Sequence, residues 1–123
     1  QTGQFFLRRL ELRLDNIVRR LGFATSLHTA RQLVLHGHVR VNGKKVDAPS
    51  FALKAGDVVS MSAKLKENVG VKLSLEHATR KAHRPEFLEF DEGQFSGKVV
   101  RDPAREESSF AVNDQLIVEY YSR

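Results

Sequence analysis

The sequence of 123 residues contains no cysteine, one methionine and only three prolines. The absence of cysteine excludes disulfide scaffolds, cysteine-ligated zinc and cysteine nucleophiles from this chain. Its longest uninterrupted apolar runs, such as 33–35 and 116–118, have three or four residues, too few to cross a bilayer. Neither a glycine-rich phosphate loop nor a dinucleotide-binding fingerprint occurs. With 41% hydrophobic residues, the chain has enough apolar material for one compact domain with a modest core.

Charge is distributed unevenly along the chain. Twenty Lys and Arg against fifteen Asp and Glu leave a net charge of +5. Residues 1–84 carry +10 and all five histidines, whereas residues 85–123 carry −5. This asymmetry favours binding of a polyanion by the basic body, the alternative being a solvated surface whose charges happen to segregate. For the acidic tail, we expect docking on the basic body or on a basic neighbouring protein, without contact to the polyanion. A packed extension with a solvated acidic face is an equally open alternative.

Hydrophobic periodicity predicts two helices at the start. Apolar residues at steps of three and four predict a helix from Phe6 to Leu21, ended by Gly22. Ser26 is a typical N-cap for a second short helix, which ends at Gly37. Two such helices form a helix-turn-helix-like unit.

The period then changes to two, which indicates a small antiparallel sheet. Val39–Val41 alternates like a half-buried strand, and Asn42-Gly43 is a strong hairpin signal before the return strand at 44–46. A second turn at 55–57 precedes a strand at 58–61. Residues 5–62 are therefore expected to form an α+β domain, a two-helix unit packed on a small antiparallel sheet.

Residues 63–123 are expected to form an extension packed against that domain. A helical face predicts a third helix over about 71–82, stopped before Pro85. Phe87, Phe90 and Phe95 are expected core anchors of short strands or turns. The final apolar run predicts a terminal strand over about 115–121.

No catalytic, metal or cofactor site is predicted. His36 and His38 lack a third ligand at a recognised spacing, so packing or phosphate contact is the better interpretation. Ser26 near His28 is explained by helix capping. The carboxylates of Glu86, Glu89 and Asp91 fit a solvated strand face.

The basic residues do form a candidate RNA-binding set. Guanidinium groups bind phosphates in bidentate fashion, and lysine acts as a point charge. Arg9, Arg13 and Arg20 are spaced to project from nearly one helical face, so packing of the two helices could gather them with the residues that follow. The set drawn from the residues alone is Arg9, Arg13, Arg20, Arg31, Gln32, His38, Arg40, Lys44 and Lys45. Few exposed aromatics are expected, which favours recognition of RNA backbone and shape over base stacking.

Four segments carry a family resemblance. Residues 10–16 (LELRLDN), 21–24 (LGFA), 30–34 (ARQLV) and 36–43 (HGHVRVNG) resemble the S4 RNA-binding domain, also called the alpha-L motif. That domain occurs in a small-subunit ribosomal protein, pseudouridine synthases, tyrosyl-tRNA synthetases and a ribosome-associated heat-shock protein. The resemblance implies that Arg13, Arg31, Gln32 and the turn Asn42-Gly43-Lys44 face RNA.

The second half points to one host of this domain. Residues 85–89 (PEFLE), 97–101 (GKVVR) and 115–123 (QLIVEYYSR) resemble the C-terminus of the bacterial-type S4 family of small-subunit ribosomal proteins. The resemblance implies a non-enzymatic protein of the cytoplasmic small ribosomal subunit that binds its ribosomal RNA early in assembly and influences decoding accuracy. Implied partners are neighbouring ribosomal proteins, the fifth small-subunit protein among them, and mRNA where it enters the subunit.

The chain departs from that family at three places. It opens with Gln1 and lacks the family's N-terminal region, so a C-terminal fragment is expected. Thr25-Ser26-Leu27 stands where a basic start to the second helix is usual, and Ala55 replaces a frequent proline. The alternative function is an S4 module that targets an RNA-modifying enzyme or a ribosome-associated accessory protein, although the tail carries no catalytic motif.

Overall fold

The computed structural model describes residues 8–81 and 84–103, and the predicted strand at 115–121 lies outside them. A helical turn over 8–11 comes first. The elements that follow are α2 (Leu14–Leu21), α3 (Leu27–Leu35), β1 (Val39–Val41), β2 (Lys44–Lys45), β3 (Val58–Met61), the 3-10 helix η1 (Ala63–Glu67), α4 (Val69–Lys81), β4 (Leu88–Asp91) and β5 (Ser96–Val99). The predicted α+β class is confirmed.

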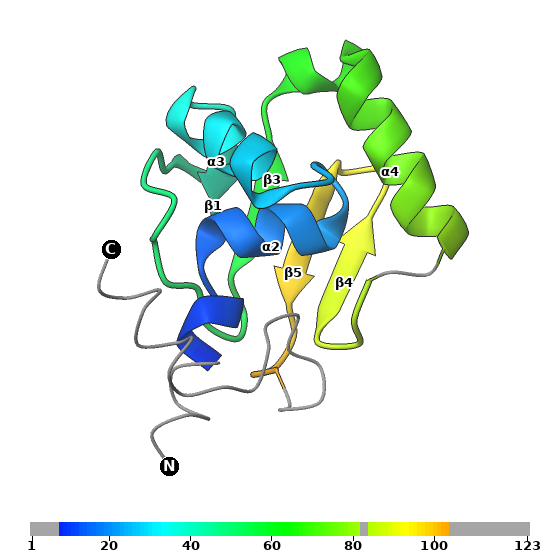
Figure 1. The fold of residues 1–123 in the computed structure, drawn as a ribbon. Coiled ribbons are helices and arrows are strands. Elements are labelled where there is room, and N and C mark those ends of the chain that lie inside the picture. The colour runs from blue at the N-terminus through cyan, green and yellow to red at the C-terminus, as the bar shows by residue number, and fades with distance from the viewer. Residues whose placement is uncertain (1–7, 82–83, 104–123) are drawn as a thin grey trace.

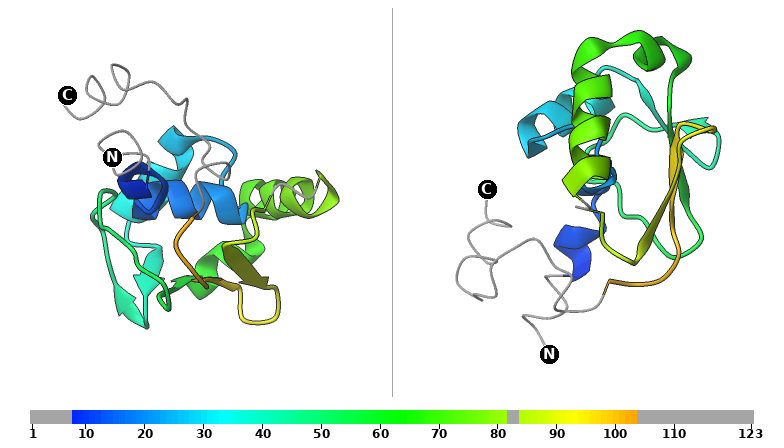
Figure 2. Two further views of the ribbon diagram at one scale, coloured as in Figure 1. Left: turned by 90° about the horizontal axis from the view of Figure 1, so that it is seen from below. Right: turned by 90° about the vertical axis from the view of Figure 1, so that its right-hand side faces the viewer.

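One antiparallel sheet runs through the described residues in the order β2-β1-β3-β5-β4. The helices α2, α3 and α4 lie on one side of it (Figures 1 and 2). Within the sheet, β3 pairs with β5, and Val59 lies opposite Gly97. The strands of the second half therefore extend the sheet of the first half across residue 62.

The prediction of one continuous helix up to Leu21 is wrong. The chain is extended at Arg13, with φ −66° and ψ 143°, and α2 begins only at Leu14. The reason is tertiary hydrogen bonding: Leu14 N donates to Phe51 O (2.8 Å), and Leu53 N donates to Leu12 O (2.9 Å). The loop before β3 thus forms hydrogen bonds with backbone groups that would otherwise bond within a continuous helix. The buried apolar stripe is kept on both sides of the break.

The local signals around α3 and the hairpin are confirmed. The Ser26 hydroxyl accepts a hydrogen bond from Thr29 N (3.1 Å) and caps α3. Asn42 and Gly43 have φ of 52° and 83°, as a two-residue hairpin with the twist of its strands requires. The Asn42 amide adds two hydrogen bonds, accepting from Val58 N (2.9 Å) and donating to Asp57 (3.0 Å).

Aromatic side chains join the second half to the core. Phe87 is fully buried and Phe95 is 8% exposed. The Phe23 ring, at the end of α2, packs edge-on against Phe90 at 5.8 Å and Phe95 at 5.2 Å between centroids. The predicted core anchors are confirmed, and the third helix is observed as α4, two residues earlier than its predicted start.

Candidate nucleic-acid interface

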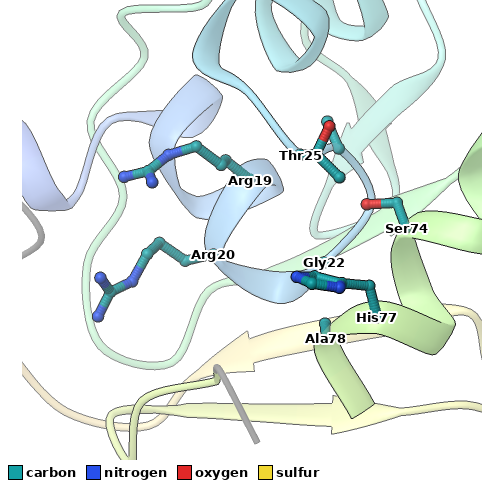
Figure 3. A pocket seen from close by; sticks show the side chains of 8 residues that line it. Arg19, Arg20, Gly22, Thr25, Ser74, His77 and Ala78 are labelled. Atoms are coloured by element: carbon teal, nitrogen blue, oxygen red, sulfur yellow. The ribbon is translucent and has the colours of Figure 1, made fainter. Parts of the chain in front are cut away.

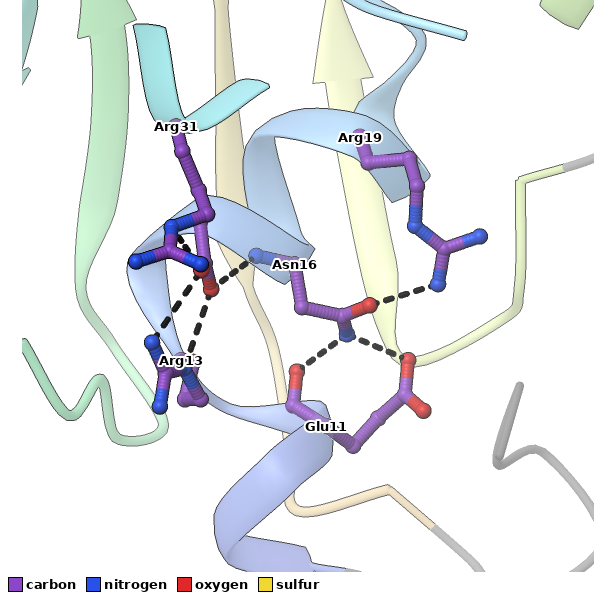
Figure 4. Close-up of polar contacts among 6 residues, drawn as sticks. Glu11, Arg13, Asn16, Arg19 and Arg31 are labelled. Carbon is purple, nitrogen blue, oxygen red and sulfur yellow. Dashed lines mark hydrogen bonds and ion pairs between the residues drawn. The ribbon is translucent and has the colours of Figure 1, made fainter. Parts of the chain in front are cut away.

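Three polar side chains are buried where the helical turn 8–11 meets α2. Glu11, Asp15 and Asn16 have side chains 0%, 1% and 0% exposed. Removing a carboxylate from water costs several kcal/mol unless it is paired and hydrogen-bonded. Both carboxylates therefore need cationic partners, and four arginines from α2, its N-cap and α3 surround them. Figure 4 shows three of these arginines, Arg13, Arg19 and Arg31.

Asp15 is shared by two of these arginines. Arg13 binds it in bidentate fashion, with Nε donating to Oδ1 and Nη2 to Oδ2, both at 3.2 Å. Arg31 reaches the same carboxylate from α3, with Nε 3.9 Å from Oδ2. The backbone N–H of Asn16 also donates to Oδ1, at 2.7 Å. One buried carboxylate thus ties the start of α2 to α3.

Glu11 and Asn16 hold the other two arginines. The Asn16 amide donates to the backbone oxygen of Glu11 (2.7 Å) and to its Oε2 (2.8 Å). Arg19 Nη2 donates to the Asn16 oxygen (2.6 Å), and Arg20 Nε lies 3.3 Å from Glu11 Oε2. Burial lowers the pKa of Arg19 below its ordinary value, while the charge of Glu11 opposes that shift. The guanidinium still stays cationic because arginine is not deprotonated in proteins.

The β1–β2 hairpin presents three exposed cations, Arg40, Lys44 and Lys45. Arg40 on β1 is paired directly opposite Lys45 on β2. Like charges at opposed positions of a sheet are destabilising. Among the ion pairs found within residues 8–81 and 84–103, none involves these three side chains. An anion bound across the hairpin would remove the repulsion.

The hairpin also meets the end of α3. A Cβ placed on Gly37 would lie 2.5 Å from Lys45 Cε and 2.9 Å from its Nζ, so the lysine chain lies across this glycine. On α3, Arg31 and Gln32 line a shallow groove with His28 and Leu35. Lys45 of the hairpin thus lies across the chain just after the C-terminal end of α3.

Comparisons with known proteins fit this arrangement. The sequence profile described as the S4 domain matches residues 12–59. Over 99% of its length the chain is 48% identical to the small ribosomal subunit protein uS4 of Acetivibrio thermocellus, of which it covers 58%. It is 46% identical to the uS4 protein of Fusobacterium nucleatum, with 99% of the chain and 60% of that protein covered.

The chain is similar to uS4 proteins over nearly its whole length. It spans about 58–60% of the length of the curated relatives that it matches. The profile match ends at residue 59, but the similarity to uS4 proteins continues through the second half, where β4 and β5 complete the sheet.

The expectation that Arg9, Arg13 and Arg20 share one helical face is wrong. Arg13 is the N-cap residue, outside α2, and contacts Asp15 toward α3. Arg20 contacts Glu11 and lines a cleft between α2 and α4 together with Ser74 (Figure 3). The break before Leu14 separates Arg9, which is exposed, from the helix that carries Arg20.

The remaining predicted site residues occupy varied environments. His38 is half-buried, with Nδ1 3.2 Å from the Ser62 hydroxyl. The Asn42 amide is engaged with Asp57 and Val58, so its first role is to hold the turn. Gly43 lies at the exposed turn itself. Contact of any of these residues with RNA stays a prediction.

Sequence reasoning missed the buried carboxylates. Glu11, Asp15 and Asn16 were not proposed as site residues, yet they organise four arginines. Asn16 lies off the apolar stripe that ends at Leu21, whereas a signal was present at Glu11, which stands three and seven residues before the apolar Leu14 and Val18. Polar residues so placed are buried, and buried carboxylates need cationic partners.

Two further features are absent from the part of the chain that the structure describes. No group of three or more His, Cys, Asp or Glu residues there is arranged to hold a metal ion. Within the same residues, no helix combines the length and the apolar character needed to cross a membrane.

Proposed function

We propose that this chain binds small-subunit ribosomal RNA through the hairpin cations Arg40, Lys44 and Lys45 and through Arg31 on α3. The observation that carries the proposal is the opposed pair Arg40 and Lys45, two exposed like charges in register. A fold that keeps such a repulsive pair on its surface is suited to a polyanion, whose phosphates neutralise both charges.

Recognition is of backbone and shape. Phe51 is the one exposed Phe, Tyr or Trp ring in residues 8–81 and 84–103, and one such ring is too few for a stacking platform that follows a single strand. Arginine forks and lysine point charges suit the closely spaced phosphates of folded RNA.

We further propose a structural role in the cytoplasmic small subunit, in its early assembly and in decoding accuracy, without catalysis. The names of the relatives, small ribosomal subunit proteins, support this role. Neighbouring proteins of the subunit, the fifth among them, and mRNA where it enters the subunit are the proposed further partners.

A salt titration of binding to small-subunit ribosomal RNA tests the proposal. Each neutralised phosphate contributes about −0.7 to −0.9 to the slope of log K against log salt. With about four phosphates engaged, affinity should fall about 10²-fold between 50 and 200 mM salt. An affinity independent of salt would contradict electrostatic binding of RNA.

A further inference from the structure

We propose that Asp15 is a positioning residue for RNA binding, which acts by holding the exposed guanidinium of Arg31. The inference rests on the proposed function, because it assigns to a buried carboxylate a role in the same RNA-binding surface. Asp15 itself is 1% exposed and does not touch the RNA, whereas the Arg31 side chain is 57% exposed.

The geometry around Asp15 explains how it acts. Its two oxygens are fixed by the Asn16 backbone N–H at 2.7 Å and by the bidentate Arg13 pair. Arg31 Nε lies 3.9 Å from Oδ2, so this fixed carboxylate attracts the Arg31 guanidinium toward one place beside α3. The carboxylate also screens the repulsion between two guanidinium groups that approach it from different elements (Figure 4).

A positioning role and a simple charge effect of Asp15 predict opposite changes in RNA affinity for Asp15→Asn. If Asp15 acted only through its charge, Asp15→Asn would remove one negative charge beside the basic surface and strengthen RNA binding. If Asp15 positions Arg31, the same change releases that side chain, which must then be ordered again upon binding, and affinity falls. Asp47→Asn is the matched control, since Asp47 is exposed, follows the basic hairpin and loses the same charge.

The test measures binding of the 123-residue chain to small-subunit ribosomal RNA over a range of salt, at a temperature where each variant is folded by circular dichroism. We expect Asp15→Asn to weaken binding about 3- to 10-fold and to reduce the salt slope by about one, as for one lost phosphate contact. Asp47→Asn should bind as tightly as the unchanged chain, or slightly tighter. Partial unfolding would lower apparent affinity without changing the slope.

A double-mutant cycle shows whether the effect passes through Arg31. Asp15→Asn should cost almost nothing more once Arg31→Gln is present. Additive losses, or a gain of affinity in Asp15→Asn, would overturn the inference. If Asp15→Asn does not fold, Arg31→Lys decides: we expect it to weaken binding nearly as much as Arg31→Gln, and affinity equal to the unchanged chain contradicts positioning. Failure of the proposed function is distinct, because the unchanged chain would then show no salt-dependent binding.

Discussion

Gly22 is the residue at which the chain leaves α2, and it lacks a side chain for two separate reasons. Its φ of 104° lies in the left-handed region, which other residues enter at a cost of roughly 1–2 kcal/mol. In addition, a Cβ at Gly22 would lie 2.6 Å from the Cβ of Ala78 on α4, closer than two carbon atoms can approach. Gly22 therefore ends α2 and also leaves the space that α4 needs to pack against it.

Gly22→Ala should lower the free energy of unfolding by about 2–5 kcal/mol, the sum of backbone strain and overpacking. Gly56→Ala isolates the first contribution, since Gly56 has φ of 98° but no atom within 4 Å of an added Cβ. The control should lose only about 1–2 kcal/mol. Urea unfolding followed by circular dichroism measures both, and equal losses would show that α4 does not pack on Gly22.

Residue type alone did not separate the arginines by role. The sequence identifies Arg13, Arg20 and Arg40 equally as basic, yet the first two face buried carboxylates and the third is opposed to a lysine. The difference depends on which side chains the fold brings together across elements, and periodicity within one element cannot supply that information.

At the scale of elements, the sequence predicted helix ends and turns correctly where a local residue signal was strong and no tertiary contact opposed it. The Ser26 cap, the Asn42-Gly43 turn and the glycine at the end of α2 were all predicted, because each needs a particular residue type for a local backbone conformation. The helix break at Arg13 was not predicted, because it is imposed by hydrogen bonds from residues about forty positions later in the chain.

Residues of the β4–β5 hairpin pack in the same hydrophobic core as residues of the S4 domain. A substitution at Phe87, just before β4, tests whether the two parts unfold together. Phe87→Ala removes a fully buried ring and should cost about 3–5 kcal/mol of unfolding free energy. Phe51→Ala, at a position 39% exposed, should cost much less. Thermal unfolding should remain one transition that shifts as a whole. A second transition, with the first half unaffected by Phe87→Ala, would mean that the two halves fold independently.

For the whole molecule, the net charge of +5 understates the basic surface, since residues 1–84 carry +10. Inside the fold, part of that charge is matched by Glu11 and Asp15, and part is left exposed on the hairpin. We expect the exposed part to bind RNA and the matched part to shape the surface that does so.

The measurement that tests this account most directly compares two double variants that each remove two positive charges. Arg40→Gln with Lys45→Gln alters the hairpin, and Lys64→Gln with Lys66→Gln alters exposed lysines on η1. For the hairpin pair, the account predicts at least about 10-fold weaker binding of small-subunit ribosomal RNA, a salt slope smaller by about two, and unchanged or higher stability because the repulsion is relieved. The η1 pair should change affinity by less than about threefold. Equal losses from both pairs would contradict a binding surface centred on the hairpin.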